Sequence, residues 1–155
     1  MRRLPRPDAA RPENKGRYAR GLDVLLSMSQ EKMELVTDRL AEVAPDFARL
    51  VVEFAFGDLF TRPALDIHAR ELVAIAVLTA RGDSIAPLRA HVSSATKLGL
   101  SREQIVEAMM QVSIYSGFPV VINALTACHD LLTTATDADC EVCPAPRQPT
   151  DVGQS

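Results

Sequence analysis

Apolar residues recur along this chain at spacings of three and four, which is the period of an α-helix. The clearest case is the unbroken apolar run of residues 72–78, which follows a polar start. This run predicts a helix over residues 67–81 that is buried on nearly every side. Asp66 is placed to cap its start, and Gly82 to end it in the left-handed conformation.

A second helix is predicted from residue 83 or 84 up to Gly99, with Pro87 in its first turns. Its inner face is formed by positions three and four apart: Leu88, His91, Val92, Ala95 and Leu98. One imidazole therefore interrupts an otherwise apolar stripe. This makes His91 the first candidate for chemistry.

The same period predicts further helices over residues 14–28, 30–43, 45–57, 101–115 and 119–132. Pro45 suits the first position of its helix, and Ser101 with Gln104 forms a capping box. Strand alternation and hairpin turn signals are absent from the sequence. We therefore expect an all-α fold, a single-domain bundle of six or seven helices.

Composition divides the chain into three parts. A chain of 155 residues that is 47% hydrophobic is long enough for one ordinary core. Residues 14–133 carry the helical pattern and form the predicted domain. The Arg- and Pro-rich residues 1–13 are expected to be a flexible arm, and the polar residues 134–155 a disordered tail.

Charge and cysteine content narrow the function classes. A net charge of -3 and a pI near 5.6 give no basic surface for nucleic acid. No apolar run approaches the roughly 18 residues that would span a bilayer. Three cysteines do not make a disulfide framework, which suits a reducing compartment. Taken together, these observations lead us to expect a cytoplasmic protein without membrane or nucleic-acid partners.

Several motifs occur in a characteristic order. They are Arg17-Tyr18 with Gly21-Leu22, the run from Phe56 to Pro63, Leu65-Asp66 with Arg70-Glu71-Leu72 and Gly82, Leu88-Arg89-x-His91, the helix start from Gly99 to Ile105, and Tyr115-Ser116-Gly117-Phe118-Pro119. Together they resemble the carboxymuconolactone decarboxylase family of small helical proteins, within the alkylhydroperoxidase D-like superfamily. The resemblance covers about residues 17 to 132 and implies a homotrimer or homohexamer. It also implies cofactor-free decarboxylation of a γ-carboxymuconolactone-like lactone or a related ring-derived acid.

His91 and Glu71 are the candidate catalytic residues. An imidazole beside apolar walls can be tuned for proton transfer, although a core histidine bonded to a backbone carbonyl fits the pattern as well. The resemblance places His91 at the family's active-site histidine, and Glu71 at the proton-relay glutamate of the related alkylhydroperoxidase branch. Alternatively, Glu71 pairs with Arg70 or faces solvent on the first helical turn.

Arg89, Arg62 and Tyr115 are the candidate substrate-binding residues. Guanidinium groups near the two central helices would clamp a carboxylate, and a phenol would donate to a substrate oxygen. Surface ion pairs for the arginines and packing for Tyr115 are the alternatives.

Two other functions remain open at this point. Cys140 and Cys143 form a Cys-x-x-Cys that could support a thiol-dependent, alkylhydroperoxidase-like peroxidase, but they lie in the polar tail. A zinc site would need two more ligands at suitable spacing, so no metal is expected. The chain could also be a non-catalytic helical binding protein.

Overall fold

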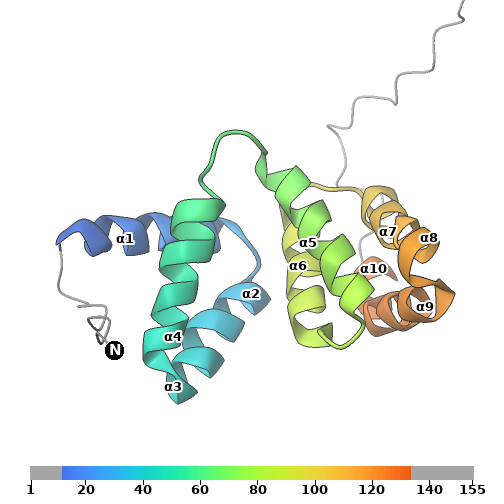
Figure 1. Cartoon of the computed structure of the whole chain (residues 1–155), viewed down its shortest axis with the longest axis horizontal. Helices are drawn as coiled ribbons and strands as arrows, with labels where there is room; N and C mark the ends of the chain where they lie inside the picture. Colours follow the sequence, from blue (N-terminus) through green and yellow to red (C-terminus); the bar gives the residue numbers. More distant parts are fainter. Residues whose placement is uncertain (1–11, 134–155) are drawn as a thin grey trace, which may run out of the picture.

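The computed structural model describes residues 12–133, and every regular element in that range is a helix (Figure 1). The first half of the molecule contains α1 (Pro12–Ser27), α2 (Gln30–Glu34), the π-helical segment η1 (Leu35–Leu40), α3 (Ala41–Val43), α4 (Pro45–Leu50) and the π-helical segment η2 (Val51–Leu59). The second half contains α5 (Ile67–Arg81), α6 (Ile85–Lys97), α7 (Arg102–Gln111), α8 (Ser113–Ser116), α9 (Phe118–Ala127) and α10 (His129–Thr133). The predicted all-α, single-domain fold is confirmed.

In the first half, α1 crosses η2 at a contact between two glycines. A β-carbon at Gly21 would overlap the carbonyl oxygen of Val52, and one at Gly57 would overlap the carbonyl oxygen of Arg17. Only glycine allows the two backbones to approach this closely. Beside this crossing, Arg17 Nε donates to Asp58 Oδ1 at 3.0 Å. The core below is made of Leu25, Met28, Val36, Val52 and Phe56.

The π-helical segments continue neighbouring α-helices without a break. Residues 30–43 form one rod and residues 45–59 another. The wider hydrogen-bond spacing is visible where the amide of Phe60 donates to the carbonyl of Ala55, five residues back, at 2.9 Å. Such segments are rare and frequently occur at functional sites. Here residues of both η1 and η2 line a cavity together with residues of α6.

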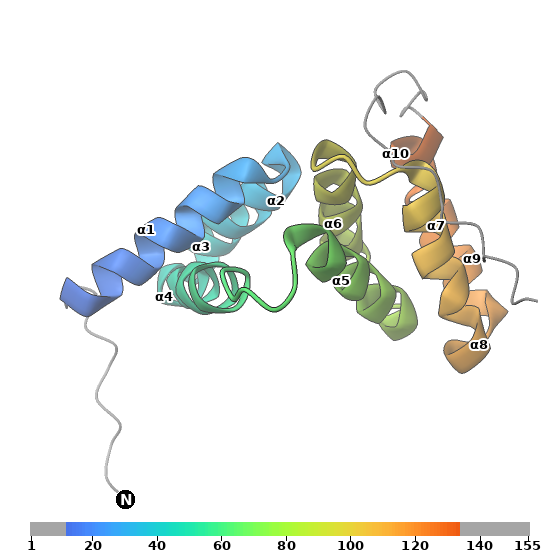
Figure 2. The same cartoon turned by 90° about the horizontal axis from the view of Figure 1, so that it is seen from above.

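The second half is built on α5 and α6, with α7 and α9 packed behind them (Figure 2). In this half, α5 and α7 begin or end at the capping residues that the sequence predicted. Asp66 accepts from the amide of Ala69 at 2.8 Å, Gly82 ends α5 with a φ of 73°, and Ser101 forms the capping box with Gln104. Its core comprises Ile75, Leu88, Val92, Ala95, Leu100, Ile105, Met109, Ala124, Cys128 and Leu132.

Polar contacts join the two halves at the turn between α1 and α2. The hydroxyl of Ser94 donates to that of Ser29 at 3.1 Å, and Ser29 also caps the amide of Lys32 at 3.2 Å. Lys97 Nζ donates to the carbonyl oxygen of Met28 at 2.5 Å. These bonds fix the position of α2 against α6.

Some sequence-based expectations need correction. The helix over residues 67–81 is not buried on nearly every side, because Val73 and Val77 are 56% and 55% exposed. The helix that starts at Pro45 runs to Leu59 because its last turns are π-helical, and the last helix is interrupted at Cys128. No helix within residues 12–133 has the length and apolar character needed to cross a membrane. The predicted arm and tail lie outside the described residues, apart from the last residues of the arm, which belong to α1.

The glycine crossing yields a stability prediction. We expect Gly21→Ala to lower the free energy of unfolding by about 1–3 kcal/mol or more, because the new methyl group meets backbone that must move. Urea unfolding followed by circular dichroism measures the change. Gly16→Ala is the matched control in the same helix, since its β-carbon would meet only the Arg20 side chain at 3.5 Å. The control should be stabilised by up to ~1 kcal/mol. Equal effects at both positions would contradict the close crossing.

Candidate active site

Glu71 lies on the inner face of α5, and its side chain is fully buried. It shares that face with Ile75 and Thr79, at a spacing of four residues. An ionised carboxylate in such surroundings requires partners, because removing it from water is costly. Glu71 therefore depends on charged or hydrogen-bonding groups from other elements.

The first partner is Lys32 of α2, only 2% of which is exposed. Its Nζ donates to Glu71 Oε1 at 2.7 Å. The same ammonium group lies 5.9 Å and 5.7 Å from the ring centroids of Phe56 and Phe60, within the range of a cation–π interaction. Lys32 thus brings a buried positive charge from the first half of the molecule to α5.

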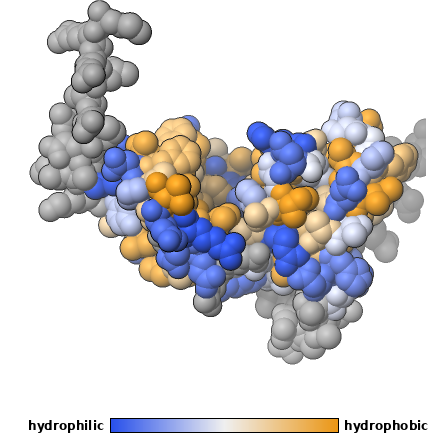
Figure 3. Space-filling model, turned by 90° about the horizontal axis from the view of Figure 1, so that it is seen from below, coloured by the Kyte–Doolittle hydropathy of each residue, from blue (hydrophilic) through white to orange (hydrophobic). Residues whose placement is uncertain are grey.

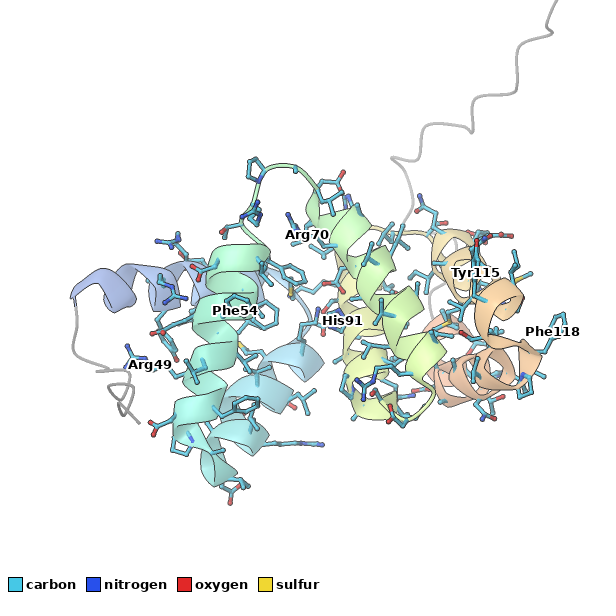
Figure 4. The ribbon with its side chains drawn as sticks, in the orientation of Figure 1. Arg49, Phe54, Arg70, His91, Tyr115 and Phe118 are labelled. Carbon is cyan, nitrogen blue, oxygen red and sulfur yellow. The ribbon has the colours of Figure 1, made fainter. Side chains whose placement is uncertain are left out.

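The second partner is His91 of α6, which lies between the two halves in Figure 4. Its Nδ1 is 2.8 Å from Glu71 Oε2 and 3.0 Å from Lys32 Nζ. The three side chains therefore contact one another pairwise. Because Nδ1 is occupied by these contacts, Nε2 is the ring nitrogen that remains for a ligand.

A cavity of about 230 Å³ adjoins this cluster. Its polar lining comes from Lys32 and His91, and its walls from η1, η2 and α6. The apolar residues around it include Leu35, Val36, Val51, Phe56, Phe60 and Pro87. This is smaller than the roughly 300–1,000 Å³ of common ligand pockets, which favours a compact ligand with an apolar body.

Burial and neighbouring charges have opposite effects on the pKa values of Lys32 and Glu71. Burial lowers the pKa of the Lys32 ammonium below its ordinary value of 10.5, although the carboxylate of Glu71 acts in the opposite direction. Burial alone would raise the pKa of Glu71. The hydrogen bond from His91 and the charge of Lys32 outweigh that effect and hold it below its ordinary value of 4.5. Glu71 is therefore ionised at neutral pH.

The contacts at Nδ1 of His91 allow two proton arrangements. If Nδ1 donates to Glu71, then Nε2 is an unprotonated base facing the ligand. If Nδ1 accepts from Lys32, then Nε2 carries the proton and is an acid. The two roles exchange when Nε2 gains or loses a proton at the ligand while Nδ1 loses or gains one at its partners in the cluster. The arrangement can thus both deliver and remove a proton at a ligand atom.

A model of the carboxymuconolactone decarboxylase family matches residues 45–130. The chain belongs to this family. The 4-carboxymuconolactone decarboxylase of Acinetobacter baylyi is 34% identical over 104 residues, which are 66% of this chain and 77% of that protein. The nitrosuccinic acid decarboxylase of Metarhizium robertsii is 27% identical over 108 residues, 67% of this chain and 74% of that protein. An uncharacterised protein of Methanocaldococcus jannaschii is 27% identical over 95 residues, which are 61% of this chain and 86% of that protein.

Of the sequence-predicted site residues in this family member, the structure brings together Glu71 and His91. Glu71 pairs with Lys32, and neither with Arg70 nor with solvent, so that alternative is wrong. Arg70 instead donates to the carbonyl oxygens of Leu65 and Arg62.

The predicted anion clamp is not assembled beside His91. Both terminal nitrogens of Arg89 are hydrogen-bonded to the Asp130 carboxylate, at 2.6 Å and 2.7 Å, and one also donates to the carbonyl oxygen of Ala127. Arg62 is exposed in the segment before α5. Tyr115 is 82% exposed at the far end of the second half, away from His91 (Figure 4). None of the three lines the cavity.

Sequence reasoning missed Lys32. The family match begins at residue 45, so it includes Glu71 and His91 but not this lysine. A signal was nevertheless present, because Lys32 lies four residues after Met28 and four before Val36, both of which are buried. A single cation in an apolar stripe is the same kind of observation that singled out His91.

Within residues 12–133, no group of three or more His, Cys, Asp or Glu side chains is arranged to hold a metal ion. Cys140 and Cys143, the pair considered for thiol chemistry, lie outside the described residues. Cys128 is buried in the core of the second half.

The buried ion pair yields a prediction about pH and stability. We expect Glu71→Gln to lower the free energy of unfolding by about 3 kcal/mol at neutral pH, since it leaves the Lys32 charge buried without its counter-ion. Because folding lowers the pKa of Glu71, its carboxylate stabilises the protein above pH 4.5, and this contribution is lost as the pH falls through the folded-state pKa. The difference between Glu71→Gln and wild type should therefore shrink in acid. Urea unfolding at several pH values measures it.

Two further variants complete this test. Glu107→Gln, on the exposed surface of α7, is the matched control and should leave stability within about 0.5 kcal/mol of wild type. Lys32→Met combined with Glu71→Gln should be more stable than Glu71→Gln alone, because the second change removes the uncompensated charge. Additive losses in the double variant would refute the direct coupling of the two residues.

Proposed function

We propose that this protein is a cofactor-free decarboxylase of a small carboxylic acid, with His91 as the proton carrier. The observation that carries the proposal is the contact of Lys32, Glu71 and His91 at the wall of an apolar cavity. Such a site can orient an acid, accept the negative charge left by carbon dioxide, and return a proton.

The names of two relatives support this class of reaction. They describe decarboxylases of 4-carboxymuconolactone and of nitrosuccinic acid. Both names denote acids with an electron-withdrawing group, a lactone or a nitro group. In such acids the electrons of the broken carbon–carbon bond delocalise within the substrate itself. We therefore propose a γ-carboxymuconolactone-like lactone or a related ring-derived acid as the substrate.

The proposed reaction begins with the substrate carboxylate against the apolar walls. Loss of hydration there destabilises the carboxylate relative to neutral carbon dioxide. The electron pair moves to the carbonyl oxygen of the substrate and forms an enolate. Lys32 is the cation in the cavity lining, so we assign it the stabilisation of this oxygen. In this assignment Lys32 takes over the role that the sequence suggested for Arg62 and Arg89.

Proton delivery then falls to His91. Its Nε2 transfers a proton to the substrate carbon, while Nδ1 takes one from Lys32, so that the imidazole remains neutral. Glu71 holds both partners in place through its two oxygens. After the product leaves, Nε2 takes up a proton from water and Nδ1 returns its proton to Lys32, so both groups regain their starting forms. Glu71 therefore acts as a positioning residue, which accepts a hydrogen bond from Nδ1 once Nε2 has given up its proton.

This proposal predicts the effect of losing the imidazole. We expect His91→Gln to retain the fold but to lower turnover of 4-carboxymuconolactone at least ~100-fold, the usual lower range for losing a general acid or base. Release of carbon dioxide measures turnover, and circular dichroism checks the fold. His68→Gln is the matched control, because His68 is exposed and its Nε2 lies 2.8 Å from the carbonyl oxygen of Leu98. Near-wild-type turnover in His91→Gln would remove His91 from the mechanism.

We also propose that the protein is a homo-oligomer, a trimer or a hexamer. Large apolar side chains remain exposed on α5, α8 and α9 of the single chain: Val73, Val77, Ile114, Phe118 and Ile122. Apolar surface of this extent is unusual on a monomer and marks contact sites. Figure 3 shows apolar residues on the surface of both halves. The preference for multiples of three comes from the family.

Self-association gives a direct prediction. Sedimentation velocity at micromolar concentration should show a species several times the 16.9 kDa chain mass. Ile122→Glu should shift it toward smaller species, because a charge at a buried contact is costly. Glu107→Gln should leave the distribution unchanged. A clean monomer in the wild type would refute the proposal.

A further inference from the structure

We propose that Lys32 is also a nucleophile, which forms an iminium with the ketone or aldehyde carbonyl of a small β-oxo acid. This gives the cavity a second substrate class, because an acid of this kind loses carbon dioxide through a covalent intermediate instead of a free enolate. The inference rests on the proposed decarboxylase function. It adds a bond between enzyme and substrate that the lactone reaction does not need.

The position of the amine carries the proposal. Lys32 Nζ lies in the lining of the 230 Å³ cavity, among the rings of Phe56 and Phe60. A carbonyl carbon bound in that space can therefore approach the nitrogen. Enzymes that use lysine as a nucleophile place it in such desolvated surroundings, because the unprotonated amine is the reactive form.

The neighbours of Lys32 supply the proton acceptors that the amine needs. Glu71 Oε1 and His91 Nδ1 lie 2.7 Å and 3.0 Å from Nζ. A proton can leave the ammonium group for either of them without crossing solvent. Burial also lowers the pKa of Lys32, which favours the neutral amine. The same pair can afterwards return protons to an oxygen or a carbon of the substrate.

The steps balance with water as the only co-reactant. The nitrogen of neutral Lys32 attacks the carbonyl carbon, and the oxygen takes up a proton to form a carbinolamine. That oxygen accepts a second proton from His91 and leaves as water, while the nitrogen lone pair forms the iminium. The bond to the carboxylate then breaks, and its electron pair moves into the iminium to give an enamine and carbon dioxide. His91 takes up a proton from solvent water and transfers it to the enamine carbon, and a second water hydrolyses the resulting iminium to free the ketone and Lys32.

The first experiment uses 2,4-pentanedione, a small diketone that forms an enaminone with a reactive amine and releases water. The chain has three lysines, Lys15, Lys32 and Lys97, so peptide mapping by mass spectrometry assigns every adduct. Lys97 is the internal comparison, because it lies at the exposed end of α6 and its Nζ donates to the carbonyl oxygen of Met28 instead of lining the cavity. We expect Lys32 to react several-fold faster than Lys97, because burial lowers the pKa of Lys32 and so raises the fraction of neutral amine. Equal labelling of all lysines would overturn the proposal.

The second experiment uses acetoacetate with cyanoborohydride, which reduces an iminium to a stable amine. We expect an isopropyl group on Lys32 of the wild-type protein, because the trapped iminium has already lost carbon dioxide. Lys32→Arg should lose the adduct, whereas Lys97→Arg should retain it. Mapping of the wild-type protein decides the question even if the Lys32 variant fails to fold.

The outcomes separate the two proposals. Release of carbon dioxide from acetoacetate without an adduct on Lys32 would overturn the covalent step and leave the decarboxylase function intact. A Lys32 adduct that retains the carboxylate, with no release of carbon dioxide, would support the nucleophile and count against decarboxylation. The absence of both would overturn the assignment of β-oxo acids to this cavity, while turnover of 4-carboxymuconolactone would still test the proposed function.

Discussion

The buried carboxylate of Glu71 imposes the main constraint on this structure. It is fully removed from solvent on α5, and its two oxygens bind Lys32 of α2 and His91 of α6. Neither partner can be lost without leaving a charge or a polar group unsatisfied in the interior. The two halves of the molecule must therefore meet in one arrangement. The hydrogen bonds between Ser29 and Ser94 support that arrangement close to the ion pair.

The close packing of α1 on η2 at Gly21 and Gly57 also affects the candidate site, because η2 forms part of the cavity wall. Gly21 and Gly57 let α1 pack tightly on η2. The other side of η2 supplies Val51 and Phe56 to the cavity wall. The position of the aromatic wall beside Lys32 thus depends on how closely two backbones approach each other. The segment η2 therefore contributes both to the stability of the first half and to the shape of the cavity.

The family relationship and the geometry lead to complementary conclusions. The matched range includes Glu71 and His91, and the relatives with decarboxylase names connect the chain to loss of carbon dioxide. The geometry adds Lys32, which supplies a cation where the sequence had suggested arginines. It also explains why Arg89 is unsuited to a clamp, because its guanidinium is bound to the carboxylate of Asp130 in α10. The site is thus a compact hydrogen-bonded cluster of three ionisable side chains beside an apolar cavity.

The sequence determined the features that depend on neighbours along the chain. Asp66 caps α5, Gly82 ends it, and Ser101 with Gln104 starts α7 as expected, because these bonds join residues within one turn. The apolar periods indicated the all-α class, and the polar residues within them, together with the family resemblance, made His91 and Glu71 candidates. Only the tertiary structure brought in Lys32, which is 39 and 59 residues from its two partners. No local rule links positions so far apart. The tertiary structure also placed Arg89 on Asp130, 41 residues away, and left Val73 and Val77 exposed, because burial on a helix depends on which elements pack against it.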